Sequence, residues 1–426
     1  MRTQTAKITF IASLAAALCL TLSSCNRAVS AATPLCDSAY DRMGGVYHSY
    51  IYEPGDNTPP PFGYKPFYIS HIGRHGSRYP VDRGYVLNGL EPLSRCAEAG
   101  LLTDEGKTLL RGFEKLDSVS NGVYGFLCEE GAREHSAIAR RMYRSYRRVF
   151  HQKGRDSIAV QSTHRQRCLM SSWNFCTSLA ALSPSSHMGL VAGNKYYDLL
   201  SNAETKEISA HLKPFNKCSD AYAAAHFDFD AFYSRIFTDI EAARAFIPND
   251  RLMAETSYAN GAVAKYLGIN EIYDSLTEEE FECASRNYAG KMNCQHCNSA
   301  ENGEFRVQFA RPLLGDFIAK ADAALQEGSR IAADLRFTHD TGMMPFFGLI
   351  GLDGYDRLYT YEEAAQNWDA TRLMCMGTNL QAIFCRNRAG KVVVKLLLNE
   401  RETSIPALGK GPWYEWTQLR EFLSKR

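Results

Sequence analysis

The chain has 426 residues, of which 45% are apolar and 22% are charged, a balance typical of folded globular proteins that excludes a disordered or collagen-like chain. Its 48 lysines and arginines offset 47 aspartates and glutamates, so no overall charge attracts nucleic acid or a membrane surface. Thirteen cysteines are many for a reducing compartment, so whether they pair depends on where the chain is sent.

The first 24 residues are predicted to be a signal peptide. A short basic head precedes an uncharged apolar run at 8–22, which is short for a membrane span and right for the core of a signal peptide. The run ends in LSSC at 22–25, which resembles a bacterial lipobox, where cleavage leaves the cysteine as a lipidated first residue. An ordinary signal peptide cleaved near Ala31 is the alternative. We therefore expect an exported lipoprotein of the bacterial cell envelope, in the outer membrane or periplasm, whose one membrane contact is the lipid on Cys25.

Export would place the cysteines in an oxidising compartment. Cleavage removes Cys19 and acylation occupies Cys25, which leaves eleven of the thirteen, so at least one thiol is unpaired in the monomer. The motif Cys294-Gln-His-Cys297 has the spacing of half a zinc site or of a redox pair, but no second motif of this kind follows. We therefore expect a disulfide or an unpaired loop there, and no metal site.

Predicted strands and helices alternate on both sides of a middle stretch. An irregular segment at 26–62, with a stiff connector at Pro59-Pro60-Pro61, leads into a β-rich run. Residues 185–300 read as loop-rich and mostly helical, with no strong strand. Strands are expected at 67–70, 157–163 and 331–338, and a hairpin at 379–385 and 392–398. Helices are expected within 100–150, at 168–182 and 304–326, from 341 onward, and at 412–424.

This order of elements predicts an α/β fold in which a central sheet flanked by helices carries an inserted, mainly α-helical lobe. The expected division of the chain is a signal peptide at 1–24, an N-terminal tether at 25–62, a first part of the core at 63–184, the helical insert at 185–300, and a second part of the core at 301–426.

The sharpest chemical feature follows the first expected core strand. There Arg74 and Arg78 bracket His75, and Gly76 allows the backbone to approach a ligand closely. Guanidinium forks suit phosphoryl oxygens, and a neutral, oriented histidine between them can attack phosphorus. A basic surface loop that happens to contain a histidine is the alternative.

The run RHGSRYP at 74–80 resembles the RHGxRxP signature of the histidine acid phosphatases, branch two of the histidine phosphatase superfamily. The resemblance implies a sheet core like that of phosphoglycerate mutases. It also implies that His75 is a nucleophile that becomes a phosphohistidine, and that Arg74 and Arg78 bind the phosphate in transfer.

Two further segments are similar to blocks of the same family. The stretch 161–171 resembles its strand–turn–helix block, which implies that Arg167 is a third phosphate-binding arginine, whereas Arg165 has no counterpart. The pair His339-Asp340 matches the family's HD pair, in which the histidine binds phosphate and the aspartate protonates the leaving oxygen. An aspartate at a helix start is stabilised as the anion, so it needs a nearby phosphate dianion to raise its pKa.

Other segments indicate which members of this family the chain resembles. The stretch 127–135 resembles the family's LTxxGxxQH motif, with Glu134 in place of the usual glutamine. Residues 377–400 resemble the multiple inositol polyphosphate phosphatases, which remove phosphates from phytate and include bacterial lipoproteins. Those enzymes mostly carry His-Ala-Glu where this chain has His339-Asp340-Thr341. Some phytases place a lysine two residues beyond the proline of RHGxRxP, where this chain has Asp82.

We therefore expect a phosphomonoester hydrolase that needs neither metal nor cofactor, acting on small inositol polyphosphates such as phytate. A broad acid phosphatase of sugar phosphates, a phosphomutase and a non-catalytic anion-binding surface lipoprotein are the alternatives. Residues 131–170 carry nine arginines and one lysine against two acidic residues, which predicts either a patch beside the site that steers anions or a solvated helix face. Specificity contacts are expected within 185–300.

Overall fold

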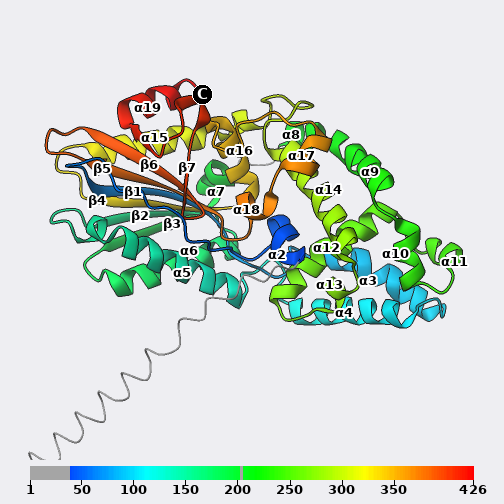
Figure 1. Ribbon diagram of the computed structural model, residues 1–426. Coiled ribbons are helices and arrows are strands. Elements are labelled where there is room, and N and C mark those ends of the chain that lie inside the picture. The colour runs from blue at the N-terminus through cyan, green and yellow to red at the C-terminus, as the bar shows by residue number, and fades with distance from the viewer. Residues whose placement is uncertain (1–38, 202–204) are drawn as a thin grey trace, which may run out of the picture.

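The computed structural model describes residues 39–201 and 205–426, so the expected signal peptide and Cys25 lie outside the described residues. A wide sheet with helices on both faces occupies one end of the molecule, and a lobe of helices occupies the other (Figure 1). The predicted α/β core with a helical lobe is thus confirmed. Within the described ranges, no helix is both long and apolar enough to cross a membrane.

Eight strands of the described chain form one sheet in the order β3-β2-β4-β1-β5-β6-β7, with β8 also paired to β6. The strands β1 to β4 run parallel, and β5 to β8 are antiparallel to their partners. Central strands are buried on both faces, as a covered parallel sheet requires. Their bounds are β1 Lys65–Arg74, β2 Ser157–Ser162, β3 His187–Ala192, β4 Ile331–Thr338, β5 Asn379–Arg386, β6 Val392–Leu398, β7 Arg401–Thr403 and β8 Trp413–Glu415.

Each face of the sheet has its own layer of helices (Figure 1). The helices α5 (Glu129–Ser145) and α6 (Gln166–Leu182) pack on one face, where Phe175 and Ile69 share a hydrophobic cluster. The helices α15 (Arg311–Leu325), α16 (Asp340–Ile350) and α19 (Trp416–Ser424) cover the other face, towards which Tyr68 points. Neighbouring residues of β1 therefore enter opposite clusters, as the two-residue period of a strand dictates.

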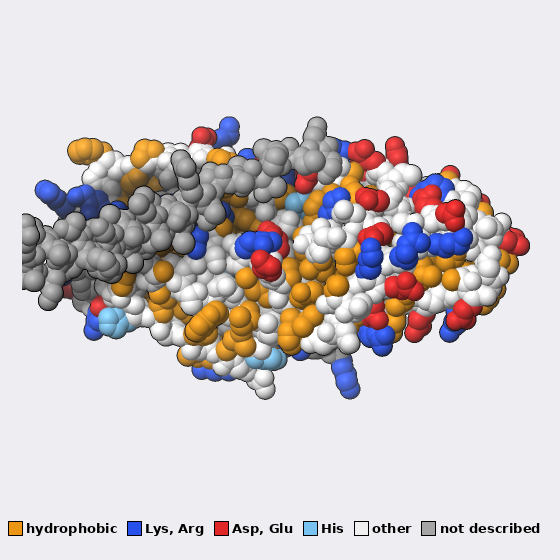
Figure 2. Space-filling view, turned by 90° about the horizontal axis from the view of Figure 1, so that it is seen from below, with side chains coloured by type: hydrophobic (Ala, Val, Ile, Leu, Met, Phe, Trp, Pro, Cys, Tyr) orange, Lys and Arg blue, Asp and Glu red, His pale blue; other side chains and the backbone are white. Residues whose placement is uncertain are grey.

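The helical lobe is built from two separate parts of the chain. Its helices include α3 (Arg83–Glu98) and α4 (Asp104–Ser120), which pack against α12 (Asp250–Tyr266) and its neighbours. The side chain of Asn260 on α12 donates to the Tyr85 carbonyl on α3, at 3.0 Å. The expected boundaries 63–184 and 185–300 therefore do not separate sheet from lobe. On the face in Figure 2, acidic and basic side chains are interspersed over the lobe, in keeping with the net charge of +1.

Two local expectations need correction. Residues 187–192 form strand β3, although no strand was expected there, because the apolar run of this edge strand is short, is interrupted by Gly189 and is mostly exposed. The start of the expected final helix is also wrong, since 413–415 form β8 and the helix begins at Trp416.

The remaining helices are α2 Ala39–Met43, α7 Asn194–Ser201, α8 Lys206–Leu212, α9 Pro214–His226, α10 Phe229–Ile236, α11 Ile240–Arg244, α13 Glu271–Asp274, α14 Glu278–His296, α17 Tyr361–Asn367 and α18 Ala370–Met374. Short 3-10 turns are η1 Gly45–Tyr47, η2 Arg147–His151, η3 Val307–Ala310 and η4 Pro406–Leu408.

The described part of the expected tether is only partly irregular. Its first residues form α2 and η1, where Tyr40 and Tyr47 are buried against the lobe. Gly45 has φ +59°, and a Cβ atom there would lie 2.4 Å from the Tyr258 hydroxyl, so only glycine fits. The aromatic side chains thus anchor this segment to the fold, and the exposed chain around the prolines at 59–61 leads from it to β1.

Candidate active site

The three segments singled out in the sequence meet at the carboxyl ends of the parallel strands β1, β2 and β4. The backbone N–H of His75 donates to the Thr338 carbonyl at 2.9 Å, so the end of β1 lies against the end of β4. The backbone N–H of Thr163, just after β2, donates to the Phe337 carbonyl at 3.2 Å. Ligand sites of α/β sheets form at this edge.

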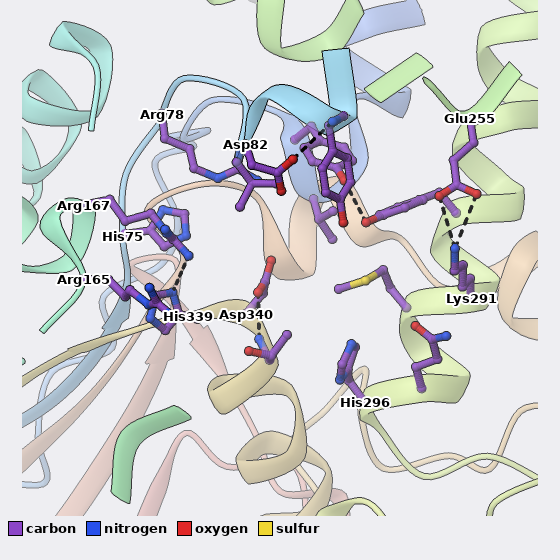
Figure 3. A pocket seen from close by; sticks show the side chains of 18 of the residues that line it. His75, Arg78, Asp82, Arg165, Arg167, Glu255, Lys291, His296, His339 and Asp340 are labelled. Atoms are coloured by element: carbon purple, nitrogen blue, oxygen red, sulfur yellow. Dashed lines mark hydrogen bonds and ion pairs between the residues drawn. The ribbon is translucent and has the colours of Figure 1, made fainter. Parts of the chain in front are cut away.

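A cavity of about 560 Å³ opens at this edge, between the sheet and the lobe (Figure 3). Five of the predicted site residues line it: His75, Arg78, Arg167, His339 and Asp340. The sixth, Arg74, is absent from the lining because its guanidinium lies behind Asp340. The structure therefore brings together all the predicted site residues that it describes.

The ring of His75 is held in its neutral form. Its Nδ1 lies 2.9 Å from the Gly76 carbonyl oxygen, and since a carbonyl can only accept, Nδ1 carries the proton. Burial, followed by the charges of Arg167 and Arg74, holds the pKa of His75 well below its usual range. The Nε2 lone pair of a neutral ring in this orientation is free to attack a bound group.

Uncompensated positive charge surrounds this ring. No carboxylate of residues 39–201 or 205–426 lies within ion-pairing distance of Arg78 or Arg167. Burial, and then the charge of Arg78, lowers the pKa of Arg167 to about 10. Two neighbouring guanidinium groups without a counter-ion are costly to hold together, and a bound anion removes that cost.

His339 is engaged on both ring nitrogens. Arg167 Nη2 donates to its Nδ1 at 3.3 Å, so in the neutral ring Nε2 carries the proton and donates to Thr163 Oγ1 at 3.1 Å. Burial, followed by the charge of Arg167, lowers the pKa of His339 to about 3. A phosphate group that draws Arg167 away would free Nδ1 and would favour the protonated ring.

Asp340, the first residue of α16, is an anion in this state. Arg74 Nη2 donates to its Oδ2 at 2.5 Å, and the Thr341 backbone N–H donates to its Oδ1 at 2.8 Å. Burial acts to raise the pKa of Asp340, but Arg74 and the nearby His296 and His339 outweigh it and lower the pKa to about 2. The site therefore has to supply a proton to Asp340 before this residue can act as an acid.

Arg74 is held more tightly than the other arginines. Its Nη1 donates to the Val46 and Met374 carbonyls at 2.6 and 2.7 Å, and its side chain is 1% exposed. Its Nε has no hydrogen-bond partner among the described residues. In this state Arg74 therefore holds Asp340 and still has an N–H donor without an acceptor.

Glu134 fixes the loop that carries His75. Its Oε1 accepts from the Tyr50 backbone N–H and from Ser77 Oγ, each at 2.7 Å, and its Oε2 accepts from the Ser77 backbone N–H at 2.8 Å. A carboxylate accepts from all three donors, whereas an amide would turn its own N–H groups towards one of them. A Cβ atom at Gly76 would lie 2.7 Å from Gly131 on α5, so this close packing requires a glycine. The sequence drew attention to Glu134 only as a substitution in a motif.

The lobe supplies the opposite side of the cavity. Its lining residues are Tyr47, Asp82, Tyr85, Glu255, Tyr288, Lys291, Met292, Gln295 and His296. Lys291 Nζ lies 3.2 Å from Glu255 Oε1, and His296 is 8% exposed with no partner for its Nδ1 in the part of the chain that the structure describes. Arg165, which the family resemblance left without a role, also lines the cavity and lies over the Tyr197 ring. The sequence assigned none of these residues to the site, although Asp82, Arg165, Gln295 and His296 lie in or beside segments that it singled out.

The basic stretch 131–170 is only partly at the site: Arg165 and Arg167 line the cavity, whereas the arginines on the exposed face of α5 lie away from it. The exposed Arg140, Arg144 and Arg147 lie near the end of α5 or just beyond it, next to the turn from which Gln152 reaches the Phe67 carbonyl at the start of β1. They are thus at the opposite end of the sheet, and the solvated face is the better interpretation. Among the described residues no cluster of three or more His, Cys, Asp or Glu side chains could hold a metal ion. Cys294 and Cys297 are buried free thiols near the end of α14.

No protein-family model matches the chain, and no curated protein matches its sequence. Solved structures match its fold. The multiple inositol polyphosphate phosphatase of Bifidobacterium longum, in complex with inositol hexasulfate, aligns with a TM-score of 0.71 and 20% identity over 90% of this chain and 97% of that one. A phytase from D. castellii gives 0.63 and 15%, over 91% and 85% of the two chains, and the Hafnia alvei phytase gives 0.54 and 12%, over 86% and 98%. The chain therefore has the fold of the histidine acid phosphatases.

Proposed function

We propose that this chain is a metal-independent phosphomonoester hydrolase that acts on inositol polyphosphates through a phosphohistidine at His75. One observation carries the proposal: a neutral histidine presents a free Nε2 in a cavity where two guanidinium groups lack counter-ions. The shared fold with proteins named phytase and inositol polyphosphate phosphatase supports the substrate class.

In the first half-reaction, Arg78 and Arg167 bind the non-bridging oxygens of a phosphate monoester. His75 Nε2 attacks phosphorus in line, and the N–P bond forms as the bond to the leaving alcohol breaks. Asp340 donates its proton to the departing oxygen, because an alkoxide is a poor leaving group. The arginines and His339 stabilise the charge on the phosphoryl oxygens throughout.

The proton on Asp340 comes with the substrate. A phosphate monoester has its second pKa at about 6, so below that pH it arrives carrying a proton. The phosphate also competes with Asp340 for Arg74, and loss of that ion pair raises the pKa of the carboxyl group. We therefore infer an acidic pH optimum for substrates with poor leaving groups.

In the second half-reaction, water attacks the phosphohistidine. Asp340, now an anion, accepts the proton of that water, and the N–P bond breaks as the new P–O bond forms. Inorganic phosphate leaves with the proton that Asp340 accepted, His75 returns to its neutral state, and Asp340, again an anion, recovers its ion pair with Arg74.

The decisive experiment measures phosphate release from p-nitrophenyl phosphate and from phytate, in the presence of a metal chelator. Wild type should hydrolyse both, and His75→Ala should lose both activities together with the acid-labile, alkali-stable phosphoenzyme of rapid-quench samples. Activity retained by His75→Ala would refute the nucleophile. Hydrolysis of p-nitrophenyl phosphate alone would refute the inositol polyphosphate substrate.

A broad acid phosphatase of sugar phosphates is the second candidate, because carboxylates line the lobe side of the cavity. Turnover of glucose 1-phosphate with no turnover of phytate would establish it. A phosphomutase would instead return the phosphate to an organic acceptor, and a non-catalytic anion-binding protein would turn over neither substrate.

We also infer that the protein is exported and anchored to the cell envelope through a lipid on Cys25. The LSSC sequence at 22–25 supports this anchor. In a bacterial host, Cys25→Ser should move the protein from the membrane fraction to the soluble fraction. An unchanged distribution would refute the lipid anchor.

A further inference from the structure

The cavity has two chemically different sides. In Figure 3, Arg78, Arg165, Arg167 and the two histidines of the site lie on one side, while Glu255 and Lys291 lie on the other. None of the three arginines has a carboxylate within ion-pairing distance in the described ranges. The side with the arginines is therefore suited to bind phosphate, whereas the side with Glu255 and Lys291 has a different chemistry.

Asp82 contributes an uncompensated negative charge to the lining. Its Oδ1 accepts from the Tyr85 backbone N–H at 3.3 Å, as the N-terminal cap of α3. No lysine, arginine or histidine that the structure describes lies within ion-pairing distance of its carboxylate. The charge of Asp82 therefore acts on whatever occupies the cavity, weakened by the solvent at its exposed rim.

Glu255 cancels the positive charge of the lobe side. Both of its carboxylate oxygens lie near Lys291 Nζ, at 3.2 and 3.4 Å. Its Oε2 also pairs with Arg251, which is itself shared with Asp220. Lys291 is thus already paired with a carboxylate, so among the described lining residues of this side no lysine or arginine is free to bind a second phosphate group.

A phosphate placed against this side would meet Asp82 directly and would have to displace Glu255 from Lys291. A hydroxyl group would instead donate to either carboxylate and accept from Lys291 or Gln295. An inositol ring that carries phosphate at every position cannot avoid presenting some of them to both sides of a cavity of about 560 Å³.

We propose that Asp82 and Glu255 are specificity-determining residues. They make the lobe side of the cavity a surface that binds hydroxyl groups and disfavours phosphate groups. Charge alone would favour inositol hexakisphosphate over inositol phosphates with few phosphate groups, and these two carboxylates reduce that preference. This inference rests on the proposed function and refines its substrate class.

The test uses a probe that needs no turnover. Isothermal titration calorimetry gives the Kd of inositol hexasulfate for wild type, Asp82→Asn and Glu255→Gln. Asparagine keeps the N-terminal cap of α3, so only the charge changes. Asp82→Asn should bind the probe about fivefold more tightly at low ionic strength, and the gain should shrink in high salt as screening increases.

Asp228→Asn is the matched control, because Asp228 caps α10 in the same way but is not among the lining residues. Its Kd should equal that of wild type. In parallel, the ratio of kcat/KM for inositol hexakisphosphate to that for inositol monophosphate should rise in Asp82→Asn and Glu255→Gln. A Kd that is unchanged or weaker in both variants would overturn the proposal, even in a fully active phosphatase. An inactive wild type that still shows the predicted Kd changes would overturn the proposed function alone.

Discussion

Two histidines buried beneath the site make the stability of this protein sensitive to acid. His71 on β1 and His135 on α5 are each 1% exposed, and the His71 ring lies against Phe175 and Phe337. Burial, followed by the charges of His135 and Arg336, lowers the pKa of His71 to about 3. Burial also lowers the pKa of His135 to about 3.

The sign and size of the effect follow from linkage. A histidine whose pKa is depressed in the fold contributes stability above its ordinary pKa of 6.5, and that stability is lost as the pH falls from 6.5 towards 3. At pH 4.5 the unfolded chain gains a proton at this site that the fold does not bind. Two pH units at about 1.4 kcal/mol each then cost about 2.7 kcal/mol for His71.

The perturbation is His71→Leu, which fills a similar volume and cannot be protonated. The free energy of unfolding, measured by urea denaturation at pH 7.0 and pH 4.5, should fall by about 2.7 kcal/mol less in the variant than in wild type. The difference between the two pH values is compared, so any change at pH 7.0 cancels. His187→Gln, at an exposed edge-strand position, should behave as wild type. Equal losses in wild type and His71→Leu would refute the reasoning.

Two further variants test the site. Asp340→Asn should reduce kcat on phytate by about 10²- to 10⁴-fold. The loss on p-nitrophenyl phosphate should be much smaller, because p-nitrophenolate leaves without a proton. Equal losses in kcat on both substrates would argue against an acid role for Asp340. Glu134→Gln should lower kcat/KM on p-nitrophenyl phosphate by about 30-fold, the equivalent of about 2 kcal/mol for one charged hydrogen bond to the His75 loop, with Glu134→Ala worse. Activity in Glu134→Gln within about twofold of wild type would mean that the loop does not depend on this carboxylate.

The sequence was sufficient to predict the parts of the fold that local signals specify. The strand before His75 and the strand before His339 are rich in residues that favour strands and end in motif residues, and both lie where they were expected. The sequence also predicted six site residues through the resemblance, and the fold brings all six close together. It could not show that Arg74 holds Asp340 in the free state, since that ion pair joins positions that are far apart in the chain.

What the sequence missed depends on long-range packing. Nothing local distinguishes the helices α3 and α4 from helices of the core, and they join the lobe only because their apolar faces meet α12 and its neighbours. The lobe side of the cavity is equally invisible, since Asp82, Glu255 and Lys291 converge from three different helices or their caps. A short edge strand such as β3, exposed on both faces, has no alternation of polar and apolar residues that would mark it as a strand.

The order of strands in the sheet has a consequence for how the chain folds. The central strand β1 ends at Arg74, but its two neighbours, β4 and β5, do not begin until Ile331 and Asn379. Pairing strands so distant along the chain is slow, because the entropy of closing the intervening loop is lost before the contacts form. During synthesis β1 therefore waits, unpaired, for most of the protein to follow. A truncation before β5 would remove one of its neighbours permanently and would leave its apolar faces open to aggregation.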